Sequence, residues 1–339
     1  MATLTTYDAS SITLVRHPVG KISADDLQLV NAELTDDLAE GEVLVKNDFM
    51  QVTAVMADLM EENPDLPMPP YLPGQALWGA AVGRVMASRN EKFSVGDVVS
   101  HMSGWRESFI SDGSDLWALI EGAYPETYYT LNQGPTAYHG IVDIAEVTDG
   151  DVVFISGAAG GVGSLAGQIA KRRGAKKVIG SAGSDEKVRY LVEELGFDAA
   201  FNYKDGSVKE KLRELAPDGL NVFFDTVGGE QFEAAIPNAA QGARFALCGA
   251  LSGQIGEAIG GFPRLDVMTA VVQQIKILPF ATYHTPEQLW AWNQSYIQWL
   301  QEGNFVFPHT LVEGGIYAAP SALVDLLAGK HRGNVIVSL

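Results

Sequence analysis

The sequence predicts an α/β fold in which a doubly wound, parallel-sheet domain is inserted into a β-rich domain. At 339 residues the chain is long for one hydrophobic core, so two domains are expected. Residues 129–307 alternate between apolar strands and amphipathic helices, the pattern of a parallel sheet covered on both faces. Residues 1–128 and 308–339 lack that alternation and are expected to form the β-rich domain together. We expect the active site in the cleft between the two domains.

Short strands divided by glycine-containing turns make up most of residues 1–128. The clearest strand candidates are "GEVLVKNDF", "AAVGRVMAS" and "VGDVVSHMSGWRESFIS". The segment "ENPDLPMPPYLPG" holds five of the 15 prolines. Because proline fixes its own φ and restricts the residue before it, this segment is expected to be an ordered, non-helical loop.

Strands and helices alternate from residue 129 onward. Val152–Ile155 is a β-branched and aromatic run, typical of a strand buried on both faces, and a second strand follows at Lys177–Ser181. The later elements are the helix "DEKVRYLVEELG", the strand "DAAFNY", the helix "SVKEKLRELA", the strand "NVFFDTV", the helix "EQFEAAIPNAA" and the strands "ARFALCG" and "IKILPFA".

A capped helix over Pro286–Glu302 closes the alternating region. Thr285 is the expected N-cap, Pro286 suits the first helical position, and Gly303 follows the end. The three tryptophans of this helix are expected to be packing residues. A helix in "PSALVDLLAGK" and a strand in "NVIVSL" then return the chain to the β-rich domain.

The composition is that of a soluble globular protein with an acidic surface. The 23 basic and 42 acidic residues give a formal charge of −19, which disfavours nucleic acid and anionic membranes as partners. No apolar run approaches the ~20 residues that span a bilayer. The N-terminal residues lack the basic start and apolar core of a secretory signal, and one cysteine suits a reducing compartment. We therefore expect a cytoplasmic protein.

The cysteines and histidines predict no metal site. A structural zinc site needs a cluster of Cys or His at short spacing, whereas this chain has one cysteine and six histidines scattered singly.

A glycine cluster follows the strand Val152–Ile155. Gly160, Gly161, Val162 and Gly163 lie between that strand and a helix, where backbone N–H groups and the helix dipole converge on one point. This geometry cradles a phosphate in dinucleotide-binding domains. Close packing of the helix on the sheet is the alternative explanation for the glycines.

The end of the second strand favours NADP(H) over NAD(H). An acidic residue there would bond the ribose 2′-hydroxyl and repel a 2′-phosphate, but the strand ends "VIGSAGS" with no acid before Asp185. Asp185 is interpreted as the N-cap of the next helix. Lys187 lies near the expected position of the 2′-phosphate, although a solvated helix residue is the alternative.

The segment "AAGGVGSLAGQIAKRRGA…GSAGSDEKVRYLVEELGFDAAFNYK", with "FFDTVGGE" and "ALCGALS", closely resembles the medium-chain dehydrogenase/reductase superfamily. Within it, the chain is similar to the zinc-free prostaglandin reductase, alkenal reductase and curcumin reductase family over nearly its whole length. The resemblance implies a Rossmann domain inserted into a GroES-like domain. Zinc-dependent members carry Gly-His-Glu where this chain has Gly74-Gln75-Ala76, so the resemblance also implies no zinc ligand there.

The resemblance implies a cofactor site made of several segments. Gly160–Gly163 match the pyrophosphate loop, Lys187 and Tyr203 the contacts to the 2′-phosphate, and Cys248, Gly249 and Ala250 the stretch beside the nicotinamide ribose. Phe280, Ala281 and Thr282 match the strand whose backbone bonds the carboxamide. Thr226 and His331 stand at two further cofactor-binding positions, where the family usually has asparagine. Core packing is the alternative for Cys248 and Phe280.

The substrate pocket departs from the family pattern. The motif that usually reads Ser-Val-Asp-Pro-Tyr-Met-Arg appears as "QVTAVMA" at residues 51–57. Tyr71, in the proline-rich loop, is the best remaining phenol to reach the cleft and is our candidate catalytic residue, with ordinary packing as the alternative.

The family resemblance implies NADPH-dependent reduction of the C=C bond of a small-molecule α,β-unsaturated ketone or aldehyde, by hydride transfer to the β-carbon. Without a metal, hydrogen-bond donors such as a ribose hydroxyl, a tyrosine or backbone N–H groups must stabilise the enolate oxygen. The alternatives are an NADPH-dependent quinone reductase and a non-catalytic NADPH-binding protein. The resemblance also implies a homodimer formed through the nucleotide-binding domain, whose exposed edge strand needs a cover.

Overall fold

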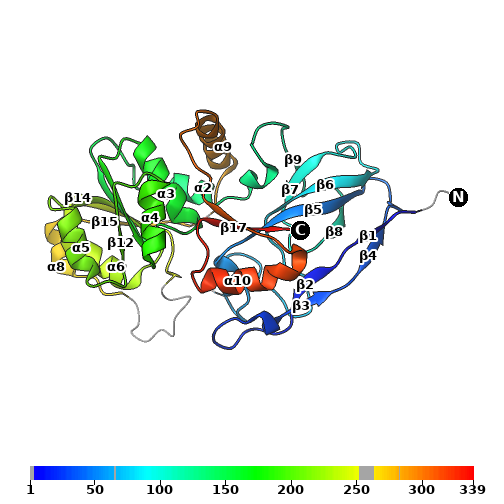
Figure 1. Cartoon of the computed structure of the whole chain (residues 1–339), viewed down its shortest axis with the longest axis horizontal. Coiled ribbons are helices and arrows are strands. Elements are labelled where there is room, and N and C mark those ends of the chain that lie inside the picture. The colour runs from blue at the N-terminus through cyan, green and yellow to red at the C-terminus, as the bar shows by residue number, and fades with distance from the viewer. Residues whose placement is uncertain (1–3, 65, 252–262, 282) are drawn as a thin grey trace. The chain divides into compact units, whose positions relative to one another are not determined.

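The computed structural model describes residues 4–64, 66–251, 263–281 and 283–339 (Figure 1). The chain divides into two compact units, Met1–Asn132 with His309–Leu339, and Gln133–Pro308. The sequence predicted domain boundaries at 128/129 and 307/308. The inserted second unit contains a parallel sheet and the first contains mainly antiparallel ones, which confirms the predicted α/β fold.

A seven-stranded sheet forms the centre of the first unit. Its order is β16-β17-β5-β6-β7-β9, with β8 paired to β5. The bounds are Val43–Val52 (β5), Ala81–Ser88 (β6), Val98–His101 (β7), Ser108–Ser111 (β8), Trp117–Ala118 (β9), His309–Val312 (β16) and Asn334–Ser338 (β17). Because β17 pairs with β5 in antiparallel register, the C-terminal segment lies in the same sheet as strands near the N-terminus.

Two small sheets and short helices complete the first unit. The hairpin-like pairs are β1 (Thr6–Asp8) with β4 (Glu33–Thr35), and β2 (Ser11–Leu14) with β3 (Leu27–Val30). The helical elements are η1 (Ala24–Asp26), α1 (Val55–Leu59), η2 (Thr127–Thr130), η5 (Gly315–Ala318) and α10 (Ala319–Leu327). Trp105, Leu323 and Val335 belong to the core that joins these pieces to the large sheet.

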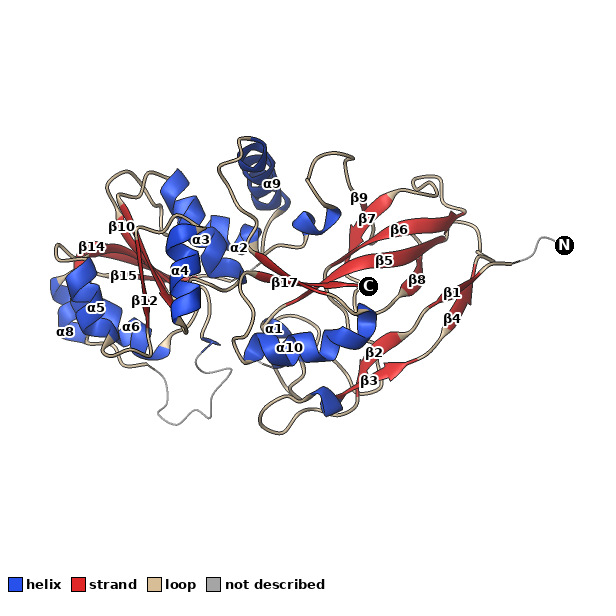
Figure 2. Cartoon of the chain, viewed as in Figure 1, coloured by secondary structure: helices blue, strands red, loops and turns tan. Residues whose placement is uncertain are grey.

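A six-stranded, fully parallel sheet forms the second unit (Figure 2). Its strands are β10 (Val152–Ile155), β11 (Lys177–Ala182), β12 (Ala199–Asn202), β13 (Leu220–Asp225), β14 (Ala239–Leu247) and β15 (Lys276–Pro279). The spatial order β12-β11-β10-β13-β14-β15 reverses direction between β10 and β13. In this strand order, ligands bind outside the carboxyl ends of the strands at the reversal point.

Helices cover both faces of the parallel sheet. They are α2 (Gly134–His139), the π-helical turn η3 (Gly140–Ile144), α3 (Gly161–Arg172), α4 (Asp185–Glu193), α5 (Val208–Leu215), α6 (Gly229–Ala235), η4 (Ile236–Asn238), α8 (Val267–Val272) and α9 (Pro286–Gln301). Phe154 and Phe223 stack on one face with ring centroids 5.0 Å apart, in a core shared with α5 and α6. Phe224 follows on β13 and approaches Gly140 at the end of α2, because side chains alternate along a strand.

Two local predictions need correction. The helix expected over "EQFEAAIPNAA" ends at Ala235 and continues as a 3₁₀ turn containing Pro237, before β14 begins at Ala239. In α9, only Trp292 is fully buried among the three tryptophans, whereas Trp290 is 65% exposed. The predicted N-cap of α9 is confirmed, since the Thr285 hydroxyl oxygen accepts a hydrogen bond from the backbone amide of Gln288.

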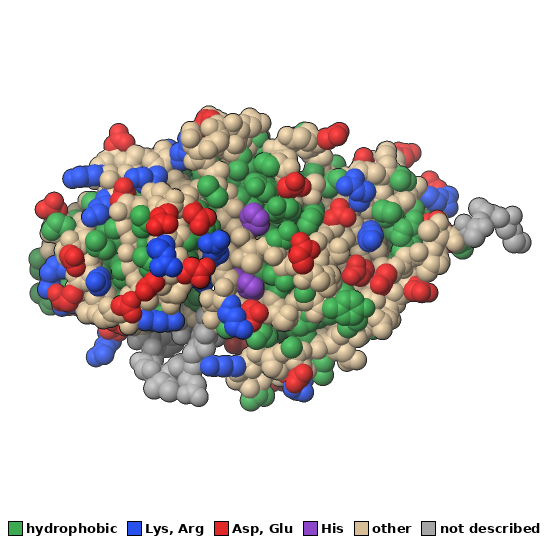
Figure 3. Space-filling model, in the orientation of Figure 1, with side chains coloured by type: hydrophobic (Ala, Val, Ile, Leu, Met, Phe, Trp, Pro, Cys, Tyr) green, Lys and Arg blue, Asp and Glu red, His purple; other side chains and the backbone are tan. Residues whose placement is uncertain are grey.

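The charged side chains are spread over the surface in view. In Figure 3, acidic and basic side chains are interspersed over the face in view, so the acidic excess forms no single patch there. Among the described residues, no helix has the length and apolar character needed to cross a membrane.

We predict that Gly167→Ala destabilises the protein, although alanine normally stabilises a helix by about 1 kcal/mol. A Cβ at residue 167 would overlap the buried ring of Phe197, and such overpacking costs about 1–3 kcal/mol. Urea unfolding measures the effect, and adding Phe197→Leu should recover part of the loss. A gain in stability from the single change would contradict the close fit.

Candidate functional site

The glycine loop joins β10 to α3 at the reversal point of the parallel sheet. Gly157 has φ of +57°, and a Cβ there would lie 2.6 Å from Thr226 Oγ1. Gly160 is the N-cap of α3 and provides no capping side chain, and the first helical bond runs from Ser164 N to Gly160 O. The amides of the first turn therefore point along the helix axis at its positive end, as an anion site requires.

The glycines also serve close packing. A Cβ on Gly163 would lie 2.6 Å from Gly157 O and 2.8 Å from Ala158 Cα, so α3 sits directly against the loop. A Cβ on Gly160 would meet only Gly157 O, at 3.3 Å. Packing thus explains Gly163, and Gly160 also lies close to the loop backbone, though less closely than Gly163. The phosphate role of Gly160, Gly161, Val162 and Gly163 stays a prediction.

A buried carboxylate ties the strand ends together. Asp225 Oδ1 accepts hydrogen bonds from Ser156 Oγ (2.6 Å), Gly228 N (2.9 Å) and Val227 N (3.0 Å). Ser156 Oγ accepts in turn from Thr226 N at 2.9 Å, and Thr226 Oγ1 donates to Ser156 O at 3.0 Å. These bonds join the ends of β10 and β13. Burial raises the pKa of Asp225 above its usual range.

The stretch after β14 is held by the same residue. The Cys248 and Gly249 amides donate to Asp225 O at 2.8 and 3.2 Å. Burial raises the pKa of the Cys248 thiol to about 12, with the Asp225 charge adding to the shift, so the thiol stays protonated near neutral pH. Gly249 fits closely, since a Cβ there would lie 3.2 Å from Thr226 O. Ala250 follows on the exposed surface.

The end of β15 lies beside the end of β14. Phe280 N donates to Leu247 O at 3.2 Å, and the Phe280 ring packs near those of Phe224 and His139. Ala281 is exposed, whereas Thr282 lies outside the described residues. The cofactor-binding roles of Phe280, Ala281 and Thr282 stay predictions.

Two lysines gather near the end of β11. Burial lowers the pKa of Lys187, and the charge of Lys204 lowers it further, against the opposing effect of Glu186. Lys204 Nζ lies 5.7 Å from the ring centroid of Tyr203, and a Cβ on Gly183 would lie 3.3 Å from the Tyr203 ring. A phosphate dianion would relieve the repulsion between the lysines. Sequence reasoning missed Lys204, which adjoins the predicted Tyr203.

The N-cap of α4 is Ser184, which corrects the assignment to Asp185. Ser184 Oγ accepts from Lys187 N at 3.3 Å, while Asp185 lies in the first turn and accepts from Asn202 Nδ2 at 3.1 Å. The Asp185 carboxylate is thereby held by the neighbouring strand β12.

The candidate catalytic tyrosine lies in the core of the first unit. Tyr71 is 2% exposed, and its hydroxyl donates to Trp78 O at 2.6 Å. Burial raises the pKa of this phenol. A hydroxyl has one proton to donate, so this geometry favours the packing interpretation that the sequence left open. His331 is half-buried in the loop between α10 and β17.

The altered segment at residues 51–57 is also well packed. Gln51 Nε2 donates to Leu131 O at 3.1 Å and Asn334 Oδ1 at 3.2 Å, and Met56 is 4% exposed. Gln75 and Ala76 follow Gly74 in a turn, and no group of three or more potential metal ligands occurs in the part of the chain that the structure describes.

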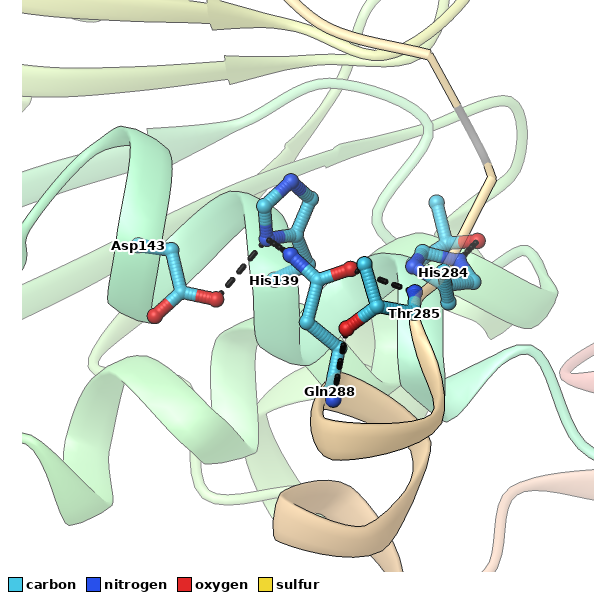
Figure 4. Close-up of polar contacts among 6 residues, drawn as sticks. His139, Asp143, His284, Thr285 and Gln288 are labelled. Carbon is cyan, nitrogen blue, oxygen red and sulfur yellow. Dashed lines mark hydrogen bonds and ion pairs between the residues drawn. The ribbon is translucent and has the colours of Figure 1, made fainter.

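A histidine cluster that the sequence did not reveal lies in the second unit (Figure 4). His139 Nδ1 lies 2.8 Å from Asp143 Oδ2 and 2.9 Å from Gln288 Nε2. His284 Nε2 lies 3.0 Å from Thr136 Oγ1, and the two imidazole rings meet edge to face, 5.9 Å apart. The only local signals were the i,i+4 spacing of His139 and Asp143 and the capping box at Thr285.

Comparisons with known proteins agree with this architecture. Residues 10–119 match the family described as the N-terminal domain of oxidoreductase, and residues 161–302 match the family described as zinc-binding dehydrogenase. The chain is 36% identical to prostaglandin reductase 1 of Mus musculus, covering 97% of this chain and 98% of that protein. It is 33% identical to the NADP(+)-dependent 2-alkenal reductase of Nicotiana tabacum, covering 96% of each.

Solved structures are also similar over nearly the whole chain. The crystal structure of CurA in complex with NADPH from Vibrio vulnificus has a TM-score of 0.89 and 30% identity, with 97% of this chain and 99% of that chain covered.

We predict that Asp225→Ala lowers the free energy of unfolding by about 3 kcal/mol or more, because three buried donors lose their acceptor. Asp225→Asn keeps an oxygen for the same bonds and should cost about 1 kcal/mol or less. Urea unfolding of both variants checks the difference. Equal losses would show that the charge, and not the hydrogen bonds, carries the effect.

The same pair tests the pH dependence of stability. Because the pKa of Asp225 is raised in the folded state, the fold binds its proton more tightly than the unfolded chain does. The contribution of Asp225 to the free energy of unfolding is therefore most favourable at acid pH. It decreases as the pH rises from the pKa of Asp225 in the unfolded chain towards its higher pKa in the folded protein. In Asp225→Asn, which cannot lose this proton, urea unfolding at a series of pH values should no longer show this decrease in the free energy of unfolding.

Proposed function

This chain belongs to the medium-chain dehydrogenase/reductase superfamily, in the family of prostaglandin, 2-alkenal and curcumin reductases, and from that membership we infer an NADPH-dependent oxidoreductase. We propose that it reduces the C=C bond of α,β-unsaturated ketones or aldehydes. The observation that supports the cofactor is the glycine loop at the reversal point of a parallel sheet, with a lysine pair near the end of β11, and the C=C bond as the site of reduction is inferred from the relatives named prostaglandin reductase and 2-alkenal reductase.

The residues present suit an anionic dinucleotide. The first turn of α3 would hold the pyrophosphate, and Lys187, Tyr203 and Lys204 the 2′-phosphate. Cys248, Gly249 and Ala250 would line the nicotinamide ribose, and the backbone after β15 would hold the carboxamide. We keep Thr226 and His331 as further cofactor contacts on the family resemblance, although the Thr226 hydroxyl already bonds to Ser156 O.

The chain's main contribution to the reaction is orientation in a site shielded from water. NADPH, when bound, supplies the hydride for the β-carbon. The protein must then offer hydrogen-bond donors to the substrate oxygen, where negative charge develops. Tyr71 would serve only if its hydroxyl left Trp78 O, so backbone N–H groups are the better candidates. We propose a zinc-independent reaction, because Gln75 stands where zinc-dependent members carry histidine.

We also propose a homodimer formed through the second unit. β15 is an edge strand of the described sheet, and the preceding helix α8 leaves apolar side chains mostly exposed, namely Val267, Met268, Val271 and Val272. An exposed apolar helix beside an open strand edge is suited to a second copy of the same surface. The expected cytoplasmic location likewise stays a prediction.

The dimer is tested by light scattering at micromolar concentration. We expect about twice the monomer mass of 36.4 kDa, and a shift towards the monomer for Met268→Glu with Val271→Glu, because charges would be buried in the interface. A monomer mass for the unmodified protein would contradict the proposal.

Cofactor preference is tested with Lys187→Ala. A charge-assisted contact to phosphate contributes about 1.5–3 kcal/mol, so this variant should bind NADPH roughly tenfold to a hundredfold more weakly and NADH almost unchanged. Lys176→Ala, which removes the same charge from an exposed position before β11, is the matched control. An equal loss of affinity for NADPH and NADH would show that Lys187 does not contact the 2′-phosphate.

The reaction is tested with NADPH deuterated at both C4 positions and a simple enone. We expect a saturated ketone with deuterium on the β-carbon, identified by mass spectrometry and NMR. An allylic alcohol labelled at the carbonyl carbon would contradict the proposed chemistry. Faster turnover of quinones than of any enone would favour the quinone reductase, and NADPH binding without turnover of either would favour a binding protein.

A further inference from the structure

His284 has one ring nitrogen bonded within the protein and one that is not. It lies in the loop between β15 and α9, four residues beyond Phe280. Its Nε2 lies 3.0 Å from Thr136 Oγ1 on α2. Its Nδ1 is buried and has no hydrogen-bond partner among the residues that the structure describes. Buried polar atoms normally have partners, so this nitrogen points to a missing one.

Neighbouring side chains fix the orientation of this ring (Figure 4). His139 meets it edge to face, and Nδ1 of His139 lies within hydrogen-bond distance of Asp143 Oδ2 and Gln288 Nε2, so that its tautomer decides whether it donates to Asp143 or accepts from Gln288. Gln288 is fixed by the capping box of α9, in which its side-chain oxygen accepts from Thr285 N at 2.9 Å. The His284 ring therefore contacts two residues of α2, one through Nε2 and one through its ring face or edge, and these contacts limit its rotation.

The chemistry of the missing partner follows from the neutral imidazole. Burial lowers the pKa of His284, and the nearby His139 lowers it further, so the ring carries one N–H and one lone pair near neutral pH. Which nitrogen carries the proton depends on whether Thr136 donates or accepts. A primary carboxamide satisfies Nδ1 in both cases, because its oxygen accepts and its NH₂ donates.

We propose that His284 binds the nicotinamide carboxamide through Nδ1 and thereby helps to position the nicotinamide ring. This inference rests on the proposed function, which places the carboxamide at the end of β15. The His139 ring packs against Phe280 at that strand end, with centroids 5.6 Å apart, and so connects the two places. The side-chain contact would add to backbone contacts from Phe280 and Ala281.

The test compares two amide substitutions that differ in which nitrogen they replace. The amide of asparagine overlays Nδ1 of histidine, whereas that of glutamine overlays Nε2. Dissociation constants are measured by fluorescence for NADPH and for 2′,5′-ADP, which has the 2′-phosphate but no nicotinamide. Tyr283→Phe, in the same loop at a half-exposed residue, controls for general effects on the loop.

We expect His284→Asn to bind NADPH within about twofold of the unmodified protein, and His284→Gln to bind it about fivefold to tenfold more weakly, the usual size of one hydrogen bond. Affinity for 2′,5′-ADP should not change in either variant. Equal weakening of both ligands, or equal NADPH affinity in both variants, would overturn the inference while leaving the proposed function intact. Failure of the unmodified protein to bind NADPH would overturn both.

Discussion

The hydrogen bonds accepted by Asp225 hold together the segments that follow β10, β13 and β14 at the candidate site. Asp225 Oδ1 accepts hydrogen bonds from the Ser156 hydroxyl and from the backbone amides of Val227 and Gly228. The Asp225 backbone oxygen accepts hydrogen bonds from the backbone amides of Cys248 and Gly249. Three strands that are far apart in sequence therefore end at fixed positions relative to one another. The glycine loop, the turn after β13 and the stretch after β14 all depend on this one residue, whose charge is costly to bury unless every bond forms.

The candidate site carries local positive charge although the chain as a whole is acidic. The formal charge of −19 repels anions at long range, yet the proposed cofactor is strongly anionic. Local structure must compensate, and two features of the second unit are suited to do so. The first turn of α3 provides partial positive charge without a side chain, and the lysine pair at Lys187 and Lys204 provides full charges. Both lie at the carboxyl edge of the same sheet.

The sequence could predict what depends on local pattern, and less of what depends on distant contacts. Strand–helix alternation, the glycine turn and the Thr285 cap are encoded within a few residues, and the structure has them. The pairing of His139 with Gln288 spans 149 positions, so each residue looked isolated. Ser184 and Asp185 both suit an N-cap, and only the backbone decides between them. The role of Tyr71 could not be decided from the sequence either, because a tyrosine hydroxyl in a loop can bond to a ligand or to a backbone carbonyl such as Trp78 O.

The state of Cys248 has a consequence for the chemical durability of the protein. The proposed substrates are Michael acceptors, which alkylate thiolates and so inactivate many proteins that carry reactive cysteines. The only cysteine here has a pKa raised to about 12, so very little of it is thiolate near neutral pH. The Cys248 side chain is partly buried as well, and its backbone amide is held by Asp225 O. A cysteine kept in the thiol form reacts slowly with such electrophiles, so the proposed substrates should modify this residue slowly.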